Sequence, residues 1–241
     1  MRIVACLNGD RRPGAHPALP VFVDQLVQDA RAVVAAGATE IHVHPRDSGG
    51  AESLEPQVIA PFMERMRADG PEVPVSLSTA LSTQPDPWRR YDLVQRWASS
   101  ALPDSVTVNM HEPGSVDLVH LLHDRRVSVE AGLWTVEAAR ILVATKVPIT
   151  AVSVEPTQVK EEDARSNADA ILSLLDRARV DEPCLLHGAD ATAWPMLQVA
   201  LESGLDIRIG LEDTMRLPDG TEAHDNAALV THAVDLTATA A

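Results

Sequence analysis

The sequence predicts a single domain with the (β/α)8 architecture of a TIM barrel. Three observations predict it: eight short apolar runs rich in β-branched residues, an amphipathic segment after each of them, and a length of 241 residues. A barrel of this class needs about 250 residues. Repeated strand–helix units indicate a parallel sheet covered by helices, and eight of them are enough to close it. We therefore treat residues 1–241 as one domain.

The predicted strands are nearly continuous apolar runs rather than alternating ones, which is typical of strands covered on both faces. They lie at residues 2–7, 40–44, 74–79, 105–110, 126–131, 149–154, 183–187 and 206–211.

The first predicted helix shows the pattern that the others repeat. Val23, Leu26, Val27 and Ala30 recur at helical spacing, and polar residues take the opposite face. Only the Ala-Thr-rich tail, 237–241, is expected to fray. The predicted helices occupy residues 23–37, 56–68, 89–100, 115–123, 135–144, 162–178, 192–203 and 224–236.

A doubly wound open sheet is the alternative fold for alternating strands and helices. That fold commonly carries a glycine-rich phosphate-binding turn after its first strand. Neither G-x-G-x-x-G nor G-x-x-x-x-G-K-[ST] follows the first strand here. The closed barrel is therefore the preferred prediction.

The net charge of the protein indicates which classes of partner it can bind. There are 20 Lys and Arg against 35 Asp and Glu, a net charge of −15. Nucleic acids and anionic membranes attract basic surfaces, so we expect neither as a partner and predict small-molecule ligands instead.

Cysteine usage and hydropathy predict a cytoplasmic protein. Cys6 and Cys184 each lie in an apolar run, which favours buried, reduced thiols over a disulfide. The apolar run at the N-terminus is too short for a signal peptide, and no run is long enough to cross a membrane.

Polar residues collect where the predicted strands end. The active site of a TIM barrel forms at the C-terminal ends of its strands, so a cluster there predicts a functional site. In strand order these residues are Asn8 to Arg12; His42, His44, Arg46 and Asp47; Ser76, Ser78 and Thr79; Thr107 and Asn109; Glu130; Glu155; His187; and Arg208 to Asp213.

His42 and His44 predict a metal site. Side chains alternate along a strand, so residues two apart share a face and can offer two imidazoles to one ion. Glu212 is the preferred third ligand, because strands two and eight are both even-numbered and their inward side chains can occupy one layer. The other candidates for the third ligand are Asp213, Asp47 and His187.

Arg208 and Asp213 form a second candidate group. An arginine at a barrel mouth is more often an anion clamp or half of an ion pair than a base. A purely structural ion pair is the alternative interpretation.

On these residues the sequence resembles the β-keto acid cleavage enzyme family, which includes the 3-keto-5-aminohexanoate cleavage enzymes. The pairing of H-x-H-x-R-D with R-x-G-x-E-D is specific, and the likeness runs from the first strand to the last helix. The resembling segments are Asn8-Gly9-Asp10-Arg11 to Pro17-Ala18-Leu19-Pro20, Ala35 to Ala38, Ile41 to Asp47, Ser78-Thr79, Glu130, Leu186-His187-Gly188, Trp194-Pro195, Arg208 to Asp213, and Asp225-Asn226-Ala227.

The resemblance implies a homotetrameric TIM barrel with zinc held by His42, His44 and Glu212. It also implies a reaction in which a β-keto acid and acetyl-CoA give acetoacetate and a new acyl-CoA. Zinc would act as a Lewis acid that stabilises the enolate of the keto acid. Addition of the enolate to the acetyl thioester would release CoA thiolate, which would attack the original ketone. A retro-Claisen cleavage would then give acetoacetate and the new acyl-CoA.

The resemblance also assigns roles to the remaining residues. An arrangement of Arg208, Asp213 and water would take the α-proton. Ser78 and Thr107 would hydrogen-bond the substrate or the developing oxyanion, and Asn109 takes the place of Thr107 if the match shifts by two residues.

Asp10 and Glu130 match carboxylates near the variable side chain of the keto acid. Two carboxylates there predict a cationic substituent, such as an amino or quaternary ammonium group. Asp10 stands where the best-known member has a longer glutamate, and the chain is shorter than many relatives. The loops that shape the pocket or the CoA entrance are therefore candidates for shortening.

Two other classes of function remain open at this point. A metal-dependent barrel that acts as an aldolase, decarboxylase or hydrolase would not use acetyl-CoA. A non-catalytic barrel could keep the fold without the activity. The complete ligand set and the Arg208 and Asp213 pair argue against a non-catalytic barrel.

Overall fold

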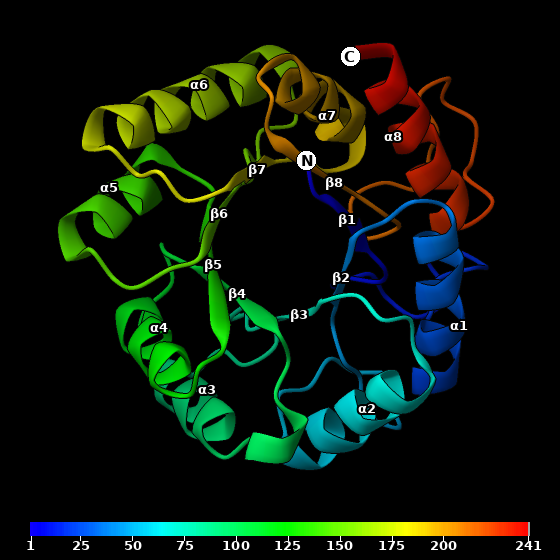
Figure 1. Cartoon of the computed structure of the whole chain (residues 1–241), viewed down its shortest axis with the longest axis vertical. Coiled ribbons are helices and arrows are strands. Elements are labelled where there is room, and N and C mark those ends of the chain that lie inside the picture. Colours follow the sequence, from blue (N-terminus) through cyan, green and yellow to red (C-terminus); the bar gives the residue numbers. More distant parts are fainter. Residues whose placement is uncertain (241) are drawn as a thin grey trace.

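A computed structural model describes residues 1–240 and forms a closed, parallel, eight-stranded barrel surrounded by helices (Figure 1). β1 pairs with β2 on one side and with β8 on the other, which closes the sheet. The predicted TIM barrel is confirmed, and the open doubly wound sheet is excluded. The strands are β1 (Ile3–Cys6), β2 (Glu40–Val43), β3 (Val75–Ser78), β4 (Ser105–Asn109), β5 (Ser128–Leu133), β6 (Ala151–Val154), β7 (Cys184–Leu186) and β8 (Asp206–Ile209).

A helix follows each strand, as the periodicity predicts. The third is shorter than expected: it ends at Gln95, and a separate 3-10 turn follows at Ser99–Ala101. The last continues to Ala240, so residues 237–240 are helical, while Ala241 lies outside the described residues. The helices are α1 (Val23–Ala35), α2 (Pro56–Asp69), α3 (Pro87–Gln95), α4 (Ser115–Asp124), α5 (Val136–Thr145), α6 (Glu161–Ala178), α7 (Ala193–Glu202) and α8 (Asn226–Ala240).

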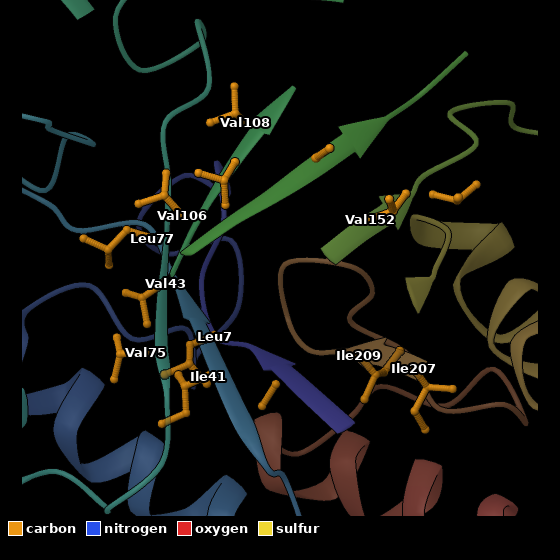
Figure 2. Packing of buried hydrophobic residues seen from close by; sticks show 14 of the residues in the cluster. Leu7, Ile41, Val43, Val75, Leu77, Val106, Val108, Val152, Ile207 and Ile209 are labelled. Atoms are coloured by element: carbon orange, nitrogen blue, oxygen red, sulfur yellow. The ribbon is translucent and has the colours of Figure 1, made fainter. Parts of the chain in front are cut away.

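The main hydrophobic core lies between the strands and the helices. Figure 2 shows side chains of this layer on several strands, among them Val43, Leu77, Val106 and Ile209. On the inner face of the barrel the apolar contacts are few. Among the described residues, a separate buried cluster there contains Val4, Cys6 and Leu185. Most of the interior is therefore available to polar side chains.

The N-terminal end of the barrel is closed by an ion-pair network around Arg2. Its guanidinium contacts Asp206 at 2.8 Å, Glu40 at 3.1 Å and Glu130 at 3.3 Å. Arg2 precedes β1, and Glu40 and Asp206 are the first residues of their strands. These charges fill the end opposite to the expected active site.

Asn226 joins the first and last strand–helix units. This fully buried residue begins α8, and its Nδ2 donates to Leu7 O at 2.8 Å and to Asp29 Oδ2 at 2.7 Å. Its Oδ1 accepts from the amide of Leu211 at 2.6 Å. The chain segments after β1 and β8 are thereby fixed to each other and to α1.

Asp29 predicts a pH dependence of stability. Burial, with a smaller contribution from the charge of Asp225, raises the pKa of Asp29 from 3.8 to about 7. The carboxyl is therefore protonated in the folded state at a pH where it is ionised in the unfolded chain. The stability it contributes is complete below pH 4 and is lost as the pH rises towards 7.

Asp29→Asn is expected to stabilise the protein, and the gain should grow by about 2 to 3 kcal/mol between pH 5 and pH 8. Urea denaturation at both pH values measures this change in the free energy of unfolding. Asp24→Asn, an exposed change on the same helix, is the control and should show no such growth. An equal effect of Asp29→Asn at both pH values would contradict the raised pKa.

Among residues 1–240, no helix combines the length and the apolar character needed to cross a bilayer.

Candidate metal centre and active site

The structure brings the three predicted metal ligands together at the C-terminal end of the barrel. His42, His44 and Glu212 each offer a ligand atom, and these atoms all lie within 4.8 Å of one another. The two imidazole rings are 5.3 Å apart between centroids. His44 Nε2 lies 3.6 Å from a carboxylate oxygen of Glu212. The group could hold one metal ion.

The backbone around His44 is fixed by Asn8, which is fully buried. The His44 amide donates to Asn8 Oδ1 at 3.0 Å, and Asn8 Nδ2 donates to His44 O at 2.9 Å. Arg46 then binds the loop after β1, donating to Gly9 O at 2.7 Å and to Arg11 O at 2.6 Å. These contacts fix the loop after β1 beside the ligand group.

The Nδ1 atom of each histidine already has a partner. His42 Nδ1 lies 3.2 Å from Ser76 Oγ, and His44 Nδ1 lies 2.7 Å from a carboxylate oxygen of Glu52. Thr83 in turn donates to Glu52 at 2.9 Å. Such partners fix ring orientation and tautomer, which leaves Nε2 of both rings for a metal.

Close backbone approach explains two glycines at this end of the barrel. Gly9 has φ +53°, and a Cβ there would lie 2.3 Å from Glu212 Cγ. A Cβ on Gly210 would lie 1.9 Å from Cys6 O. A side chain at Gly9 would therefore displace Glu212, and a side chain at Gly210 would push the segment after β8 away from β1.

The charges of the ligand group are set by burial and by neighbouring charges. Burial lowers the pKa of His42 to about 3. Burial also lowers the pKa of His44, but the negative charges of Glu212 and Glu52 have the larger effect and raise this pKa to about 9. Burial opposes ionisation of Glu212, yet Arg208 and His44 hold the pKa of its carboxyl well below its usual range. Glu212 is thus ionised, and a metal binding at His44 would displace a proton.

Glu52→Gln is expected to weaken metal binding by about tenfold or more, because it removes the charge that orients and polarises His44. Competition with a chromogenic chelator measures the dissociation constant. Glu64→Gln on the exposed face of α2 is the matched control. An unchanged affinity in Glu52→Gln would show that Glu52 only packs against the ring.

Arg208 and Asp213 form the second predicted group. Nε and Nη2 of Arg208 lie 3.1 Å and 2.9 Å from Asp213 Oδ1, and Nη2 also contacts Glu212. His187, which is 1% exposed, lies between Asp213 Oδ1 at 3.5 Å and Glu155 Oε2 at 3.6 Å. One arginine therefore links the metal ligand to the candidate base.

A cavity of about 400 Å³ opens over both groups. Several buried polar atoms of the residues that line it have no hydrogen-bond partner within the described part of the chain: Thr107 Oγ1, Trp134 Nε1, Glu212 Oε2 and Asp213 Oδ2. Buried polar groups are rarely left unpaired, so these atoms are available to ligands. The cavity is lined by Asp10, Arg11, His42, His44, Ser78, Ala80, Ser82, Thr107, Asn109, Trp134, Glu155, Ala189, Asp190, Arg208, Glu212 and Asp213.

Comparison with known proteins decides the family. The family model of the β-keto acid cleavage enzymes matches residues 1–159 and 161–241. The chain belongs to the β-keto acid cleavage enzyme family. The resemblance inferred from the sequence is confirmed, and membership makes the protein an enzyme of the acyltransferase type.

Among curated proteins, the chain is similar to 3-oxoadipate:acetyl-CoA acetyltransferase of Cupriavidus necator. The two are 25% identical over 263 residues, which cover 97% of this chain and 86% of the relative.

Solved structures support the fold. A ternary complex of ObcA with a C4-CoA adduct and oxalate matches with a TM-score of 0.77 at 13% identity, covering 93% of this chain. The match spans 64% of that longer chain. A thiamine phosphate pyrophosphorylase from Pyrococcus furiosus matches with a TM-score of 0.58 at 13% identity, covering 99% of this chain and 96% of the other. At such identities these likenesses show the barrel alone.

One residue expected in the cleavage site does not reach it. Glu130 is the third of six residues in β5 and contacts Arg2 at the opposite end of the barrel. The expected strand, 126–131, begins two residues too early. Arg126 has φ +61°, and Val127 still bonds back to Leu122 at 3.0 Å, so β5 begins only at Ser128. The expectation for Glu130 is therefore corrected.

The contacts in the structure distinguish between the candidates for the third metal ligand and between Thr107 and Asn109. Asp47 accepts from the amides of Gly49 and Ala51 in its own turn, and His187 and Asp213 stand outside the ligand group. Thr107 and Asn109 both line the cavity, but Asn109 Nδ2 is bound to Glu112 at 3.0 Å.

Two functional candidates are visible only in the structure. Glu52 lies in a loop, and no local sequence signal directs it to His44. Trp134 comes directly after β5 and lines the cavity. The strand expected from the sequence ended at residue 131, so Trp134 was not identified as a residue at a strand end. Glu155 was among the polar residues expected at the strand ends, and it lines the cavity.

Proposed function

We propose that the protein is a metal-dependent enzyme that converts a β-keto acid and acetyl-CoA into acetoacetate and a new acyl-CoA. The observation that carries the proposal is the His42, His44 and Glu212 group directly beside Arg208 and Asp213 in one cavity. Family membership supports the cleavage of β-keto acids. The name of the Cupriavidus necator relative supports acetyl-CoA as the second substrate.

The residues present fit a zinc ion. Two imidazole Nε2 atoms and a carboxylate, with Glu212 Oε2 unpartnered, form the two-histidine, one-carboxylate donor set common in catalytic zinc sites. A divalent ion bound there would supply Lewis acidity to the oxygens of the keto acid. We propose zinc as the resident metal on the basis of these donors.

Asp213 is the proposed base for the proton on the α-carbon. Its Oδ1 is held by two nitrogens of Arg208, and its Oδ2 is buried without a partner. A carboxylate held at one oxygen presents the other in a fixed direction. Arg208 orients the base, and Oδ2 accepts the proton directly or through one water molecule.

Hydroxyl groups on neighbouring strands are proposed to bind the oxygen that gains charge. Ser78 ends β3, and Thr107 lies on the inner face of β4 with Oγ1 unpartnered. Donors fixed on strands cost little reorganisation when charge develops. Asn109 is proposed as a further contact to the substrate.

The homotetramer and the cytoplasmic location also belong to the proposal. Light scattering of the purified protein tests the tetramer, and fractionation of the source cells tests the location.

The central test is mass spectrometry of reactions that contain the zinc-loaded protein, acetyl-CoA and a panel of β-keto acids. We expect acetoacetate together with the matching new acyl-CoA, and neither product with His42→Ala. Consumption of a keto acid without acetyl-CoA would favour an aldolase, decarboxylase or hydrolase. Stoichiometric metal without turnover of any keto acid would overturn the proposed reaction.

A further inference from the structure

We infer that Glu155 and Trp134 recognise a cationic group at the far end of the keto acid, with Asp10 adding to the negative field. The inference rests on the proposed function and names the substrate class of that site. It replaces Glu130, which lies at the other end of the barrel, with residues that line the cavity itself.

The order of the strands places Glu155 across the barrel mouth from the metal group. In the closed order β1 to β8, β6 is four strands from β2 in either direction. His42 belongs to β2, and Glu155 follows the last residue of β6. A keto acid whose carboxylate and ketone lie at the metal group therefore extends across the cavity towards Glu155.

Within the described residues, Glu155 forms no ion pair with an arginine or a lysine, although its negative charge acts on Arg208. Its side chain accepts no hydrogen bond within the described residues, and its ion-pair contact is with His187 Nε2 at 3.6 Å. That nitrogen also makes no hydrogen bond. A quarter of the Glu155 side chain remains exposed, so it can reach a ligand in the cavity.

The arginines that line the same cavity are already paired. Arg208 contacts both Asp213 and Glu212, and Arg11 contacts Asp190 at 2.5 Å. Asp10 lines the cavity with no recorded ion pair in residues 1–240. The charges left without a basic partner are therefore negative, which favours a cationic ligand and disfavours a second carboxylate.

Trp134 lines the same cavity as Glu155, from the neighbouring strand. It follows the last residue of β5, the strand next to β6, and its ring packs against His111 with 4.6 Å between centroids. An aromatic face beside a carboxylate suits alkylated ammonium groups, because the ring attracts a cation that has few hydrogen-bond donors.

Three matched keto acids test the inference. One ends in a trimethylammonium group, the second is its uncharged analogue ending in a tert-butyl group, and the third is 3-oxoadipate. For the unaltered enzyme we expect kcat/KM to be at least about tenfold higher for the ammonium than for the tert-butyl compound, and lowest for 3-oxoadipate.

Glu155→Gln is expected to reduce the ammonium to tert-butyl ratio by about tenfold, and Trp134→Leu should reduce it by about threefold or more. Glu162→Gln removes the same charge from an exposed position on α6 and should leave the ratio unchanged. An unchanged ratio in Glu155→Gln would overturn the inference, as would a preference of the unaltered enzyme for 3-oxoadipate.

Calorimetry provides a readout that does not need turnover. Dissociation constants of the three keto acids are measured with the zinc-loaded protein in the absence of acetyl-CoA. If no acyl-CoA forms but the ammonium compound binds most tightly and Glu155→Gln abolishes that preference, the proposed reaction fails and the recognition site stands. If acyl-CoA forms without any preference for the cation, the reaction stands and the recognition site fails.

Discussion

Asp213→Asn is expected to lower kcat/KM by about a thousandfold, equivalent to about 4 kcal/mol of transition-state stabilisation. Asparagine keeps the size of the side chain and can still accept from Arg208, but its amide cannot take a proton from carbon. Asp213 stands outside the metal group. The variant should therefore keep its metal while losing activity.

Metal content measured by mass spectrometry, together with steady-state kinetics, distinguishes this outcome from damage to the metal group. Glu212→Gln should lose metal and activity together. Asp219→Asn makes the same change in the exposed loop after β8 and should match the unaltered protein. If Asp213→Asn retained a tenth of the activity, the base would have to be a different group.

Arg90→Met is expected to cost about 3 to 5 kcal/mol of unfolding free energy. Arg90 is 1% exposed and forms an ion pair with Glu112, which is 8% exposed. It also donates to Thr79 O at 3.1 Å and to Pro113 O at 2.8 Å. Removing the guanidinium leaves a buried carboxylate without its countercharge, which is the costly outcome for a buried pair.

Urea denaturation measures the loss, and two further variants identify its cause. Arg90→Met combined with Glu112→Gln removes both charges and should recover a substantial part of the stability. Arg89→Met, an adjacent arginine with 47% of its side chain exposed, should change the free energy by less than about 1 kcal/mol. A double variant no more stable than Arg90→Met would refute the buried-charge explanation.

The same pair supports the cavity wall. Glu112 accepts from the amide of Leu81 at 3.1 Å and from Asn109 Nδ2 at 3.0 Å. The loop after β3 and the end of β4 are thereby held in one arrangement. Loss of Arg90 should therefore also raise KM for the keto acid.

The sequence predicted the metal group because its geometry depends on short-range rules. Strand alternation places His42 and His44 on one face. Glu212 lies in the turn after β8, three residues beyond Ile209, so the expectation for it depended on the end of the strand and on the family resemblance. The position of Glu52 does not follow from strand alternation. Its contact with His44 depends on the path of a loop that Arg46 fixes through hydrogen bonds to Gly9 and Arg11.

The position of β5 shows that apolar periodicity does not determine where a strand begins. The sequence placed Glu130 at the C-terminal end of its strand, but β5 begins and ends two residues later than expected. The expected depth of Glu130 in the barrel was wrong by the same two residues, about 7 Å along a strand. The start of β5 depends on how the chain leaves α4, through Arg126 at φ +61°, and apolar periodicity carries no information about that turn.

Asn226 ties the last strand–helix unit to the first, so that each of the eight units has a fixed neighbour on both sides. The cavity depends on which units are neighbours and not on which of them is translated first. A circularly permuted chain, with its present ends joined by a linker and new ends opened at residues 179–183 between α6 and β7, would keep every neighbour in place. The position of the chain ends is thus separable from the chemistry at the mouth of the barrel.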